Sequence, residues 1–212
     1  MTVAIIDYGM GNLRSVAKAF EHVGADRVLV TDDLAMLRAA DRLVFPGQGA
    51  IGSCFSHIEE HGLRDELSEL LLSKPVLGIC LGLQALFDFS EEDGGVEGLG
   101  VIPGQVLRFP EKMIDGGERA KIPQMGWNTV DQRRDHPLWR DIPDAAWFYF
   151  VHSYFVHTAN DDDLCGACQY GDIEFAAAAA RDNIFAVQFH PEKSHHDGLQ
   201  LLKNFLSWDG TW

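Results

Sequence analysis

Residues 75–84 read PVLGICLGLQ, and this stretch decides the fold. Its first part, Pro75–Ile79, is a short apolar run that is typical of a fully buried strand. Cys80 follows this strand directly, and the apolar spacing of Leu83–Phe87 indicates that a helix begins there. A cysteine between two glycines at a strand-to-helix turn, Gly-x-Cys-x-Gly, is the thiol form of a nucleophile elbow. The stretch therefore predicts an α/β protein that presents a thiol at the carboxyl end of a sheet.

The N-terminal half alternates between short apolar runs and segments with helical spacing. We expect strands at Thr2–Asp7, Arg27–Val30 and Leu43–Phe45, and helices at Asn12–Val23, Leu34–Ala39 and Leu63–Leu72. Gly24 ends the first of these helices, and Asp32 or Asp33 caps the second. Strands that alternate with helices imply right-handed crossovers. The fold expected is a mostly parallel central sheet with helices covering both faces.

The second half has few helices between its strands, so antiparallel strands are expected there. Strands are expected at Gln105–Phe109, Trp147–Val151 and Leu164–Gln169. Phe175–Arg181 reads FAAAAAR, and alanine by itself favours a helix. However, Asp182 and Asn183 are good turn residues and Ile184–Phe189 reads as a strand, so we interpret this region as a hairpin. The apolar spacing of Gly198–Trp208 predicts a closing amphipathic helix.

Length and charge exclude several classes of function. The chain has 212 residues, with 17 Lys and Arg against 32 Asp and Glu, so its net charge at pH 7 is −15. An acidic surface repels phosphate backbones and anionic lipids, so neither nucleic acid nor a membrane is expected as a partner. No linker divides the chain, so residues 1–212 are expected to form one domain. The N-terminus does not resemble a signal peptide and no apolar run approaches about 18 residues, so a cytoplasmic location is expected.

Four cysteines are present, and in a reducing compartment they are thiols by default. Cys165 and Cys168 have the spacing of half a zinc site. A zinc site needs a second pair of ligands at a matching spacing, and none is apparent. We therefore expect this pair to be buried apolar residues on or near a strand, and we expect no metal site.

A thiol nucleophile needs a base, and residues 187–192, VQFHPE, supply one just past a strand end. The proline fixes the backbone between His190 and Glu192, so the carboxylate can hold the far nitrogen of the imidazole. His152 is a rival base, but no acidic residue lies within a few positions of it. The predicted triad is therefore Cys80, His190 and Glu192.

A glycine-rich loop, Pro46-Gly47-Gln48-Gly49, follows the third strand. Peptide groups beside glycine can take orientations that other residues forbid. The backbone N–H of Gln48, together with that of Leu81, could then stabilise a developing oxyanion. Taken alone, the loop is more simply interpreted as an ordinary glycine-rich turn. Its position after a parallel strand of the same sheet favours a place in the site.

Together these features resemble the class I glutamine amidotransferases, and one branch of them closely: the glutaminase subunits of imidazole glycerol phosphate synthase. Five segments carry the resemblance in chain order: IDYGMGNLRSV at 6–16, PVLGICLGLQ at 75–84, KIPQMGWN at 121–128, YFVHSYF at 149–155 and VQFHPEKS at 187–194. The cysteine and histidine motifs mark the superfamily, while IDYGMGN and IPQMGWN mark the branch.

The resemblance implies that Cys80 attacks the carboxamide of glutamine, and that His190, oriented by Glu192, protonates the departing ammonia. It implies that substrate is held by Gly49, Gln84, Ser153 and Tyr154. It implies no cofactor. It also implies a cyclase partner of (β/α)8-barrel fold in a heterodimer, which receives the ammonia for imidazole glycerol phosphate synthesis in histidine biosynthesis. Five residues match family positions that face the partner: Asn12, Gln124, Trp127, Tyr149 and Lys193.

The chain departs from the family pattern in a few places, and three alternatives stay open. Gln48 stands where valine is usual, Ala186 where glycine is frequent, and His195-His196 where a glycine is common. The alternatives are a stand-alone cysteine hydrolase, a glutaminase of the pyridoxal phosphate, anthranilate or guanylate branches, and a non-catalytic scaffold of the same fold. The branch motifs argue against the first two, and the intact triad argues against the third.

Overall fold

The computed structural model describes residues 1–9, 11–60 and 64–212. The strands are β1 (Thr2–Ile6), β2 (Arg27–Thr31), β3 (Arg42–Gly47), β4 (Val76–Cys80), β5 (Phe89–Ser90), β6 (Val96–Glu97), β7 (Gly104–Arg108), β8 (Ile114–Asp115), β9 (Glu118–Arg119), β10 (Gln124–Gln132), β11 (Ala146–His152), β12 (Tyr154–Thr158), β13 (Leu164–Tyr170), β14 (Ile173–Arg181) and β15 (Ile184–Val187). The helices are α1 (Leu13–His22), α2 (Leu34–Ala39), α3 (Ile51–Glu60), α4 (Arg64–Leu71), α5 (Leu81–Ala85) and α6 (His195–Ser207), with short 3-10 turns η1 (Glu92–Gly94), η2 (Pro137–Trp139), η3 (Asp161–Asp163) and η4 (Pro191–Lys193).

A nine-stranded sheet forms the centre of the molecule, in the order β11-β10-β13-β14-β15-β4-β3-β1-β2. The run from β15 to β2 is parallel, and the run from β14 to β11 is antiparallel. The sequence prediction of an α/β fold with antiparallel strands in the second half is therefore confirmed.

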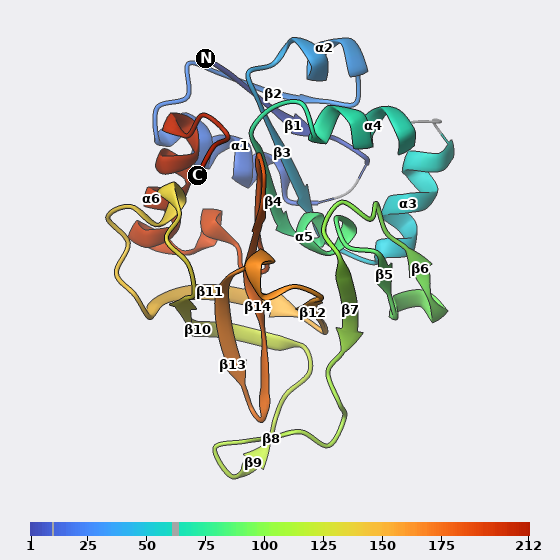
Figure 1. The fold of residues 1–212 in the computed structure, drawn as a ribbon, viewed down its shortest axis with the longest axis vertical. Helices are drawn as coiled ribbons and strands as arrows, with labels where there is room; N and C mark the ends of the chain where they lie inside the picture. Colours follow the sequence, from blue (N-terminus) through green and yellow to red (C-terminus); the bar gives the residue numbers. More distant parts are fainter. Residues whose placement is uncertain (10, 61–63) are drawn as a thin grey trace.

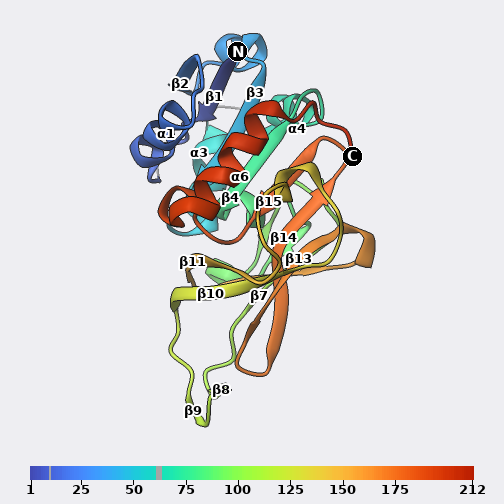
Figure 2. The same ribbon diagram turned by 90° about the vertical axis from the view of Figure 1, so that its left-hand side faces the viewer.

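Helices cover both faces of the parallel half, because alternate residues of its strands are apolar on both sides. On β1, Val3 and Ile5 pack into one buried cluster with α1 and α6. Ala4 and Ile6 pack into a second cluster with α2, α3, α4 and α5. Figure 1 shows α1 and α6 on one side of β1, β3 and β4, with α3 and α4 on the other, and Figure 2 shows α6 lying across the sheet.

A smaller sheet, in the order β12-β7-β5-β6, stands beside the central one. Its strand β7 was expected from the sequence, at Gln105–Phe109, but β5, β6 and β12 were not. The short hairpin of β8 and β9 extends at the end of the molecule far from both termini (Figures 1 and 2).

The structure corrects several expected boundaries. Strand β3 continues through Pro46 to Gly47 and does not stop at Phe45, because both residues stay in parallel register with β4. Helix α5 begins at Leu81, directly after the cysteine, and ends at Ala85. Of the amphipathic segment expected at Leu63–Leu72, the first residue lies outside the described residues, Arg64–Leu71 forms α4, and Leu72 lies just after the helix. Helix α3 was not predicted.

The alanine-rich segment is a strand, as the hairpin interpretation required. Strand β14 pairs antiparallel with β15, with Arg181 opposite Ile184 across the turn. Most of its alanines are fully buried, so packing between neighbouring strands overrides the helix preference of alanine. Among the described residues, no helix is both long enough and apolar enough to cross a lipid bilayer.

Candidate active site

The turn at Cys80 is a sharp one. Cys80 has φ 56 and ψ −107, a conformation that costs free energy for any residue with a Cβ. The two glycines are required by packing. A Cβ on Gly82 would overlap the carbonyl oxygen of Phe45 in β3, and one on Gly78 would come within 2.8 Å of the Ala186 Cβ. The motif therefore lets α5 lie against β3 while β4 packs against β15.

Strand register places functional groups on both sides of the cysteine. Gly47 of β3 is in register with Cys80, so Gln48 comes next along the chain on that side. Val187 of β15 is in register with Ile79, so Gln188 comes beside Cys80 on the other side. Because parallel strands end at one edge, β3 delivers the glycine-rich loop and β15 delivers the histidine segment to the same place.

His190 and Glu192 form a buried pair. Nδ1 of His190 donates to the Oε1 atom of Glu192 at 2.9 Å, and the two side chains are 2% and 0% exposed. The backbone N–H of His190 donates to the carbonyl of Tyr149 at 2.9 Å. The hydroxyl of Ser194 donates to the carbonyl of His190 at 2.6 Å. The imidazole is thus fixed at its ring and on both sides of its backbone.

The charge environment of His190 suits a base that becomes protonated. Burial lowers the pKa of His190, but the Cys80 sulfur and the Glu192 carboxylate both raise it and together outweigh burial. Because Nδ1 is held by the carboxylate, Nε2 is the nitrogen available for proton exchange. Nε2 is buried, and it has no hydrogen bond of normal geometry among the described residues.

Asn12 contacts the predicted triad. Its Nδ2 donates to Oε1 of Glu192 at 3.3 Å, so one carboxylate oxygen receives both the imidazole and the amide. The sequence resemblance had placed Asn12 toward a partner. In the structure its side-chain amide points to the carboxylate that orients His190, and the residue is partly exposed.

The rival base, His152, has a different environment. Its Nδ1 donates to the carbonyl of Tyr154 at 2.7 Å, and its ring lies against Phe109, Phe150 and Phe175. Burial lowers its pKa to about 4. His152 is therefore a neutral, packed imidazole at pH 7, and no carboxylate among the described residues is hydrogen-bonded to it.

A cavity of about 440 Å³ opens at Cys80, within the size range of small-molecule sites. It is lined by Gln48, Gly49, Cys80, Leu81, Gln84, Glu92, Pro123, Tyr149, Val151, His152, Ser153, Tyr154, His190 and Lys193. The structure thus brings together the predicted nucleophile and base, both predicted oxyanion residues and all four predicted substrate residues. Glu192 lies behind His190, outside this lining.

Two residues of this region were missed in the sequence. Glu92 lines the cavity, and its carboxylate accepts the N–H of Ile51 at the start of α3, at 3.0 Å. Burial raises the pKa of Glu92. Gln188 is fully buried, and its Nε2 lies 3.7 Å from the Cys80 sulfur. Glu92 sits in a polar turn that carries no motif, but Gln188 could have been found from the expected strand register.

The residues expected to face a partner divide into two groups. Trp127 is 40% exposed and stacks on His195, with ring centroids 4.9 Å apart. Lys193 lies over the ring of Tyr149 at 5.9 Å, beside the cavity. Gln124, in contrast, is only 3% exposed. Its expected outward position is wrong, because it shares the inward-facing side of β10 with Val130.

The other cysteines are buried and unsuited to attack. Burial raises the pKa of the thiols of Cys54, Cys165 and Cys168 to about 12 in each case. Cys165 and Cys168 lie on β13 as expected, and Trp139 Nε1 donates to the Cys165 sulfur at 3.3 Å.

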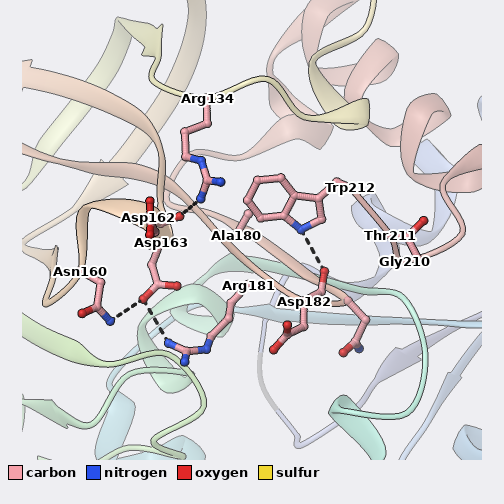
Figure 3. A pocket seen from close by; sticks show the side chains of 11 residues that line it. Arg134, Asn160, Asp162, Asp163, Ala180, Arg181, Asp182, Gly210, Thr211 and Trp212 are labelled. Carbon is pink, nitrogen blue, oxygen red and sulfur yellow. Dashed lines mark hydrogen bonds and ion pairs between the residues drawn. The ribbon is translucent and has the colours of Figure 1, made fainter.

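A larger cavity, of about 730 Å³, lies at the opposite end of the parallel strands, beside the β14–β15 turn (Figure 3). Both of its arginines are engaged with groups of the cavity wall. Arg181 pairs with Asp163 at 3.2 Å, and Arg134 lies 4.5 Å from the ring centroid of Trp212. Among the described residues that line it, there is no thiol and no imidazole.

The fold and the site together define a class of protein. Residues 4–208 match the family model described as glutamine amidotransferase class-I, so the chain belongs to that family. A crystal structure of a glutamine amidotransferase superposes with a TM-score of 0.71 at 17% identity, covering 97% of each chain. The structure of PurLQS from Thermotoga maritima gives a TM-score of 0.71 at 16% identity, again covering 97% of each chain. At such identities the likeness concerns the fold alone.

Closer relatives identify the branch. The imidazole glycerol phosphate synthase subunit HisH of Pseudomonas syringae pv. syringae is 57% identical over 211 residues, covering 100% of this chain and 99% of the relative. Subunit HisH 1 of Pseudomonas aeruginosa is 56% identical with the same coverage. The chain therefore belongs to the HisH family, the glutaminase subunits of imidazole glycerol phosphate synthase in histidine biosynthesis. The branch resemblance seen in the sequence is confirmed.

Proposed function

We propose that this chain hydrolyses glutamine through a thioester on Cys80, with His190 as the acid and base and Glu192 as the residue that orients it. One observation carries the proposal: a cysteine at a strained strand-to-helix turn shares a cavity with an imidazole whose far nitrogen is held by a buried carboxylate at 2.9 Å. This is the triad arrangement of nucleophile, base and orienting group.

The steps balance with these groups alone. The Cys80 thiolate attacks the carboxamide carbon, and protonated His190 gives its Nε2 proton to the departing nitrogen, which leaves as ammonia. Neutral His190 then takes a proton from water, and the hydroxide attacks the thioester. Glutamate departs, and the thiolate and imidazolium are restored. Each tetrahedral intermediate carries an oxyanion, for which the backbone N–H groups of Gln48 and Leu81 are the proposed donors. No cofactor is required.

The amino-acid end of glutamine is proposed to bind farther along the cavity. Gln84 and the backbone at Gly49, Ser153 and Tyr154 supply polar groups there. The Glu92 carboxylate adds a negative charge to the same wall, which complements the α-ammonium group of glutamine. This charge distinguishes an amino-acid substrate from a simple amide.

The ammonia is proposed to pass to a cyclase subunit of (β/α)8-barrel fold, in a heterodimer located in the cytoplasm, with residues 1–212 acting as one domain. Tyr149 and Lys193 line the cavity, and the exposed ring of Trp127 packs against Tyr149 with ring centroids 6.1 Å apart, so an aromatic and basic group on β10, β11 and η4 adjoins the cavity. An aromatic cluster of this kind is typical of interface centres. A net charge of −15 suits a subunit that leaves the phosphorylated acceptor to its partner.

The test measures ammonia release from glutamine in two samples: the isolated chain, and the chain in complex with its cyclase and the cyclase ligand. Amide-15N glutamine in the presence of excess unlabelled ammonium reports the transfer, because 15N in the imidazole product requires passage through the interface. We expect 15N-enriched product with the unmodified chain and none with Cys80→Ala. Ammonia release by Cys80→Ala would contradict the assignment of Cys80 as the nucleophile. A product without 15N would contradict the transfer of ammonia through the interface.

A further inference from the structure

Gln188 is a buried polar side chain beside the proposed nucleophile, and the proposed mechanism leaves it unused. It follows β15 and is fully buried, and its backbone N–H donates to the carbonyl of Ala177 at 2.8 Å. Its side-chain Nε2 lies 3.7 Å from the Cys80 sulfur, within the range of a hydrogen bond to sulfur. A buried amide placed against a reactive sulfur calls for a chemical explanation.

The direction of this amide is set by its neighbours. The carbonyl of Tyr154 can only accept hydrogen bonds, so the Gln84 side chain must turn its Nε2 toward it, at 3.1 Å. The same Nε2 also donates to Oε1 of Gln188, at 3.0 Å. The oxygen of Gln188 is thereby occupied, and its NH2 group faces Cys80. A chain of hydrogen bonds thus connects the Tyr154 carbonyl to the Gln84 amide, the Gln84 amide to the Gln188 amide, and the Gln188 amide to the Cys80 sulfur.

A donor in this position distinguishes the two protonation states of the nucleophile. A neutral thiol sulfur is a weak acceptor, whereas a thiolate accepts a charge-assisted bond that is roughly twice as strong as a neutral one. The same short segment of chain supplies His190, so the residue that donates to the sulfur and the residue that exchanges its proton come to Cys80 together.

We propose that Gln188 is a positioning residue that donates a hydrogen bond to the Cys80 thiolate, stabilises this anion and holds it for attack, with Gln84 fixing its orientation. The inference rests on the proposed function, because it requires Cys80 to be the nucleophile.

The test is the pH dependence of the alkylation rate of Cys80 by iodoacetamide, measured on the full chain by mass spectrometry of the Cys80 peptide. Gln188→Met keeps the length of the side chain and removes the donor. Because a hydrogen bond to a charged group is at stake, we expect the apparent pKa of alkylation to rise by about one to two pH units. In the complex with the cyclase, we expect kcat to fall by at least about tenfold, with KM for glutamine changed less than twofold, roughly the response to losing a contact made to the reacting group.

The matched control is Asn204→Leu. Asn204 is also a buried amide, but it donates to the carbonyls of Leu138 and Arg140 in α6 packing, outside the lining of the Cys80 cavity. It is expected to lose stability and to keep the alkylation pKa. An unchanged alkylation pKa in Gln188→Met would overturn the inference, as would an equal shift in the control.

A measurement on the unmodified chain covers the case in which Gln188→Met does not fold. The side-chain 15N–1H signals of Gln188 should shift with pH at the alkylation pKa, and this titration should vanish in Cys80→Ala. Signals that do not titrate would refute the contact. If Cys80→Ala still released ammonia, the proposed function itself would fail. If Cys80→Ala were inactive but Gln188→Met left the alkylation pKa and kcat unchanged, only the inference about Gln188 would be refuted.

Discussion

The four cysteines differ in their surroundings, and this difference separates the proposed nucleophile, Cys80, from the other three. Cys54, Cys165 and Cys168 are packed in apolar surroundings that disfavour the thiolate and raise each pKa to about 12. Cys80 lies at the cavity, beside an imidazole whose pKa is raised in part by that sulfur. Reactivity depends on the thiolate, so the environment of each sulfur decides its role.

We therefore expect a single covalent label from a glutamine-like electrophile such as diazo-oxo-norleucine. Intact-mass spectrometry should show one addition, located on Cys80, and Cys80→Ser should show none. The rate of labelling should fall in His190→Ala, because the imidazolium stabilises the thiolate. Addition at Cys54, Cys165 or Cys168 with Cys80 untouched would contradict the triad.

Glu192 supports the base from behind. Its side chain is 0% exposed, and it holds Nδ1 of His190 without lining the cavity. Glu192→Gln should keep the fold and lower kcat by about a hundredfold, the low end of what a positioned base contributes. Cys80→Ala should lose far more. Steady-state ammonia release and thermal melting check this, and complete loss in both variants at normal stability and normal glutamine affinity would indicate a more direct chemical role for Glu192.

At the scale of elements, the contact of α5 with β3 positions Cys80, the proposed nucleophile. There is no room for a Cβ at Gly82, because the carbonyl of Phe45 occupies that place. We expect Gly82→Ala to destabilise the protein by about 3 kcal/mol or more, the upper end for overpacking, and to abolish turnover. Urea unfolding measures the first effect and ammonia release the second.

The matched control is Gly24→Ala, at the end of α1. Gly24 has φ +98, and an added Cβ would meet no atom within 4 Å, so only backbone strain opposes the change. It should cost about 1–2 kcal/mol and leave turnover intact. Equal effects of the two substitutions would show that the α5 contact has no special role.

The sequence predicts those features of the elements that are determined by residues close together in the chain. The strand before Cys80, the turn at Asp182 and the His190–Glu192 spacing all follow from residues adjacent in the chain. Helix α3 was missed although its apolar residues have helical spacing. Its first N–H groups are capped from a distance, by Glu92 and Asp93, at 3.0 and 3.1 Å, and the residues before it hold no cap of their own.

Long-range contacts explain the remaining differences. Pro46 stays in β3 because parallel register with Ile79 extends that strand, which no local pattern shows. Gln124 turns inward because strand alternation, and not polarity, decides its side. The contact of Asn12 with Glu192 joins residues 180 positions apart. The approach of His190 to Glu192 was therefore predictable from the motif, while the contact of Asn12 with Glu192 required the three-dimensional structure.

For the whole molecule, burial of neutral imidazoles makes stability depend on pH. His136 accepts the N–H of Leu138 at Nδ1, and burial lowers its pKa to about 3. In the unfolded chain a histidine titrates near about 6.5. The unfolded state therefore takes up a proton between these values that the folded state does not, so this contribution to stability is lost as pH falls from about 6.5 toward about 3.

His136→Asn keeps a side-chain acceptor for Leu138 and removes the titration. Between pH 6 and 4, the free energy of unfolding of the unmodified chain should fall more steeply than that of the variant, by up to about 1.4 kcal/mol per pH unit. Urea unfolding at several pH values gives both slopes. Parallel slopes would mean that burial of His136 is not linked to acid stability.

At the level of assembly, we predict that binding of the partner controls the orientation of the oxyanion donor in the Gln48 loop. Gln48 is half-buried between glycines, Gly49 has φ +99, and both line the cavity whose mouth carries Tyr149 and Lys193. Peptide planes beside glycine rotate at low cost, so the N–H of Gln48 can be turned away from the oxyanion until a partner at the mouth fixes the loop. Loss of one such donor typically lowers turnover by about 10²–10³-fold.

We therefore expect low glutaminase activity in the isolated chain, and a rise of at least about a hundredfold when the cyclase is bound to its acceptor. The rise should appear in kcat, because the donor acts on the transition state and not on bound glutamine. Such control prevents waste of glutamine when no acceptor is present. Steady-state kinetics of the isolated chain and of the liganded complex decide the question. Full kcat in the isolated chain would refute control of the loop by the partner. An activation that changes only KM would indicate that the partner acts on the substrate residues Gln84 and Ser153 and not on Gln48.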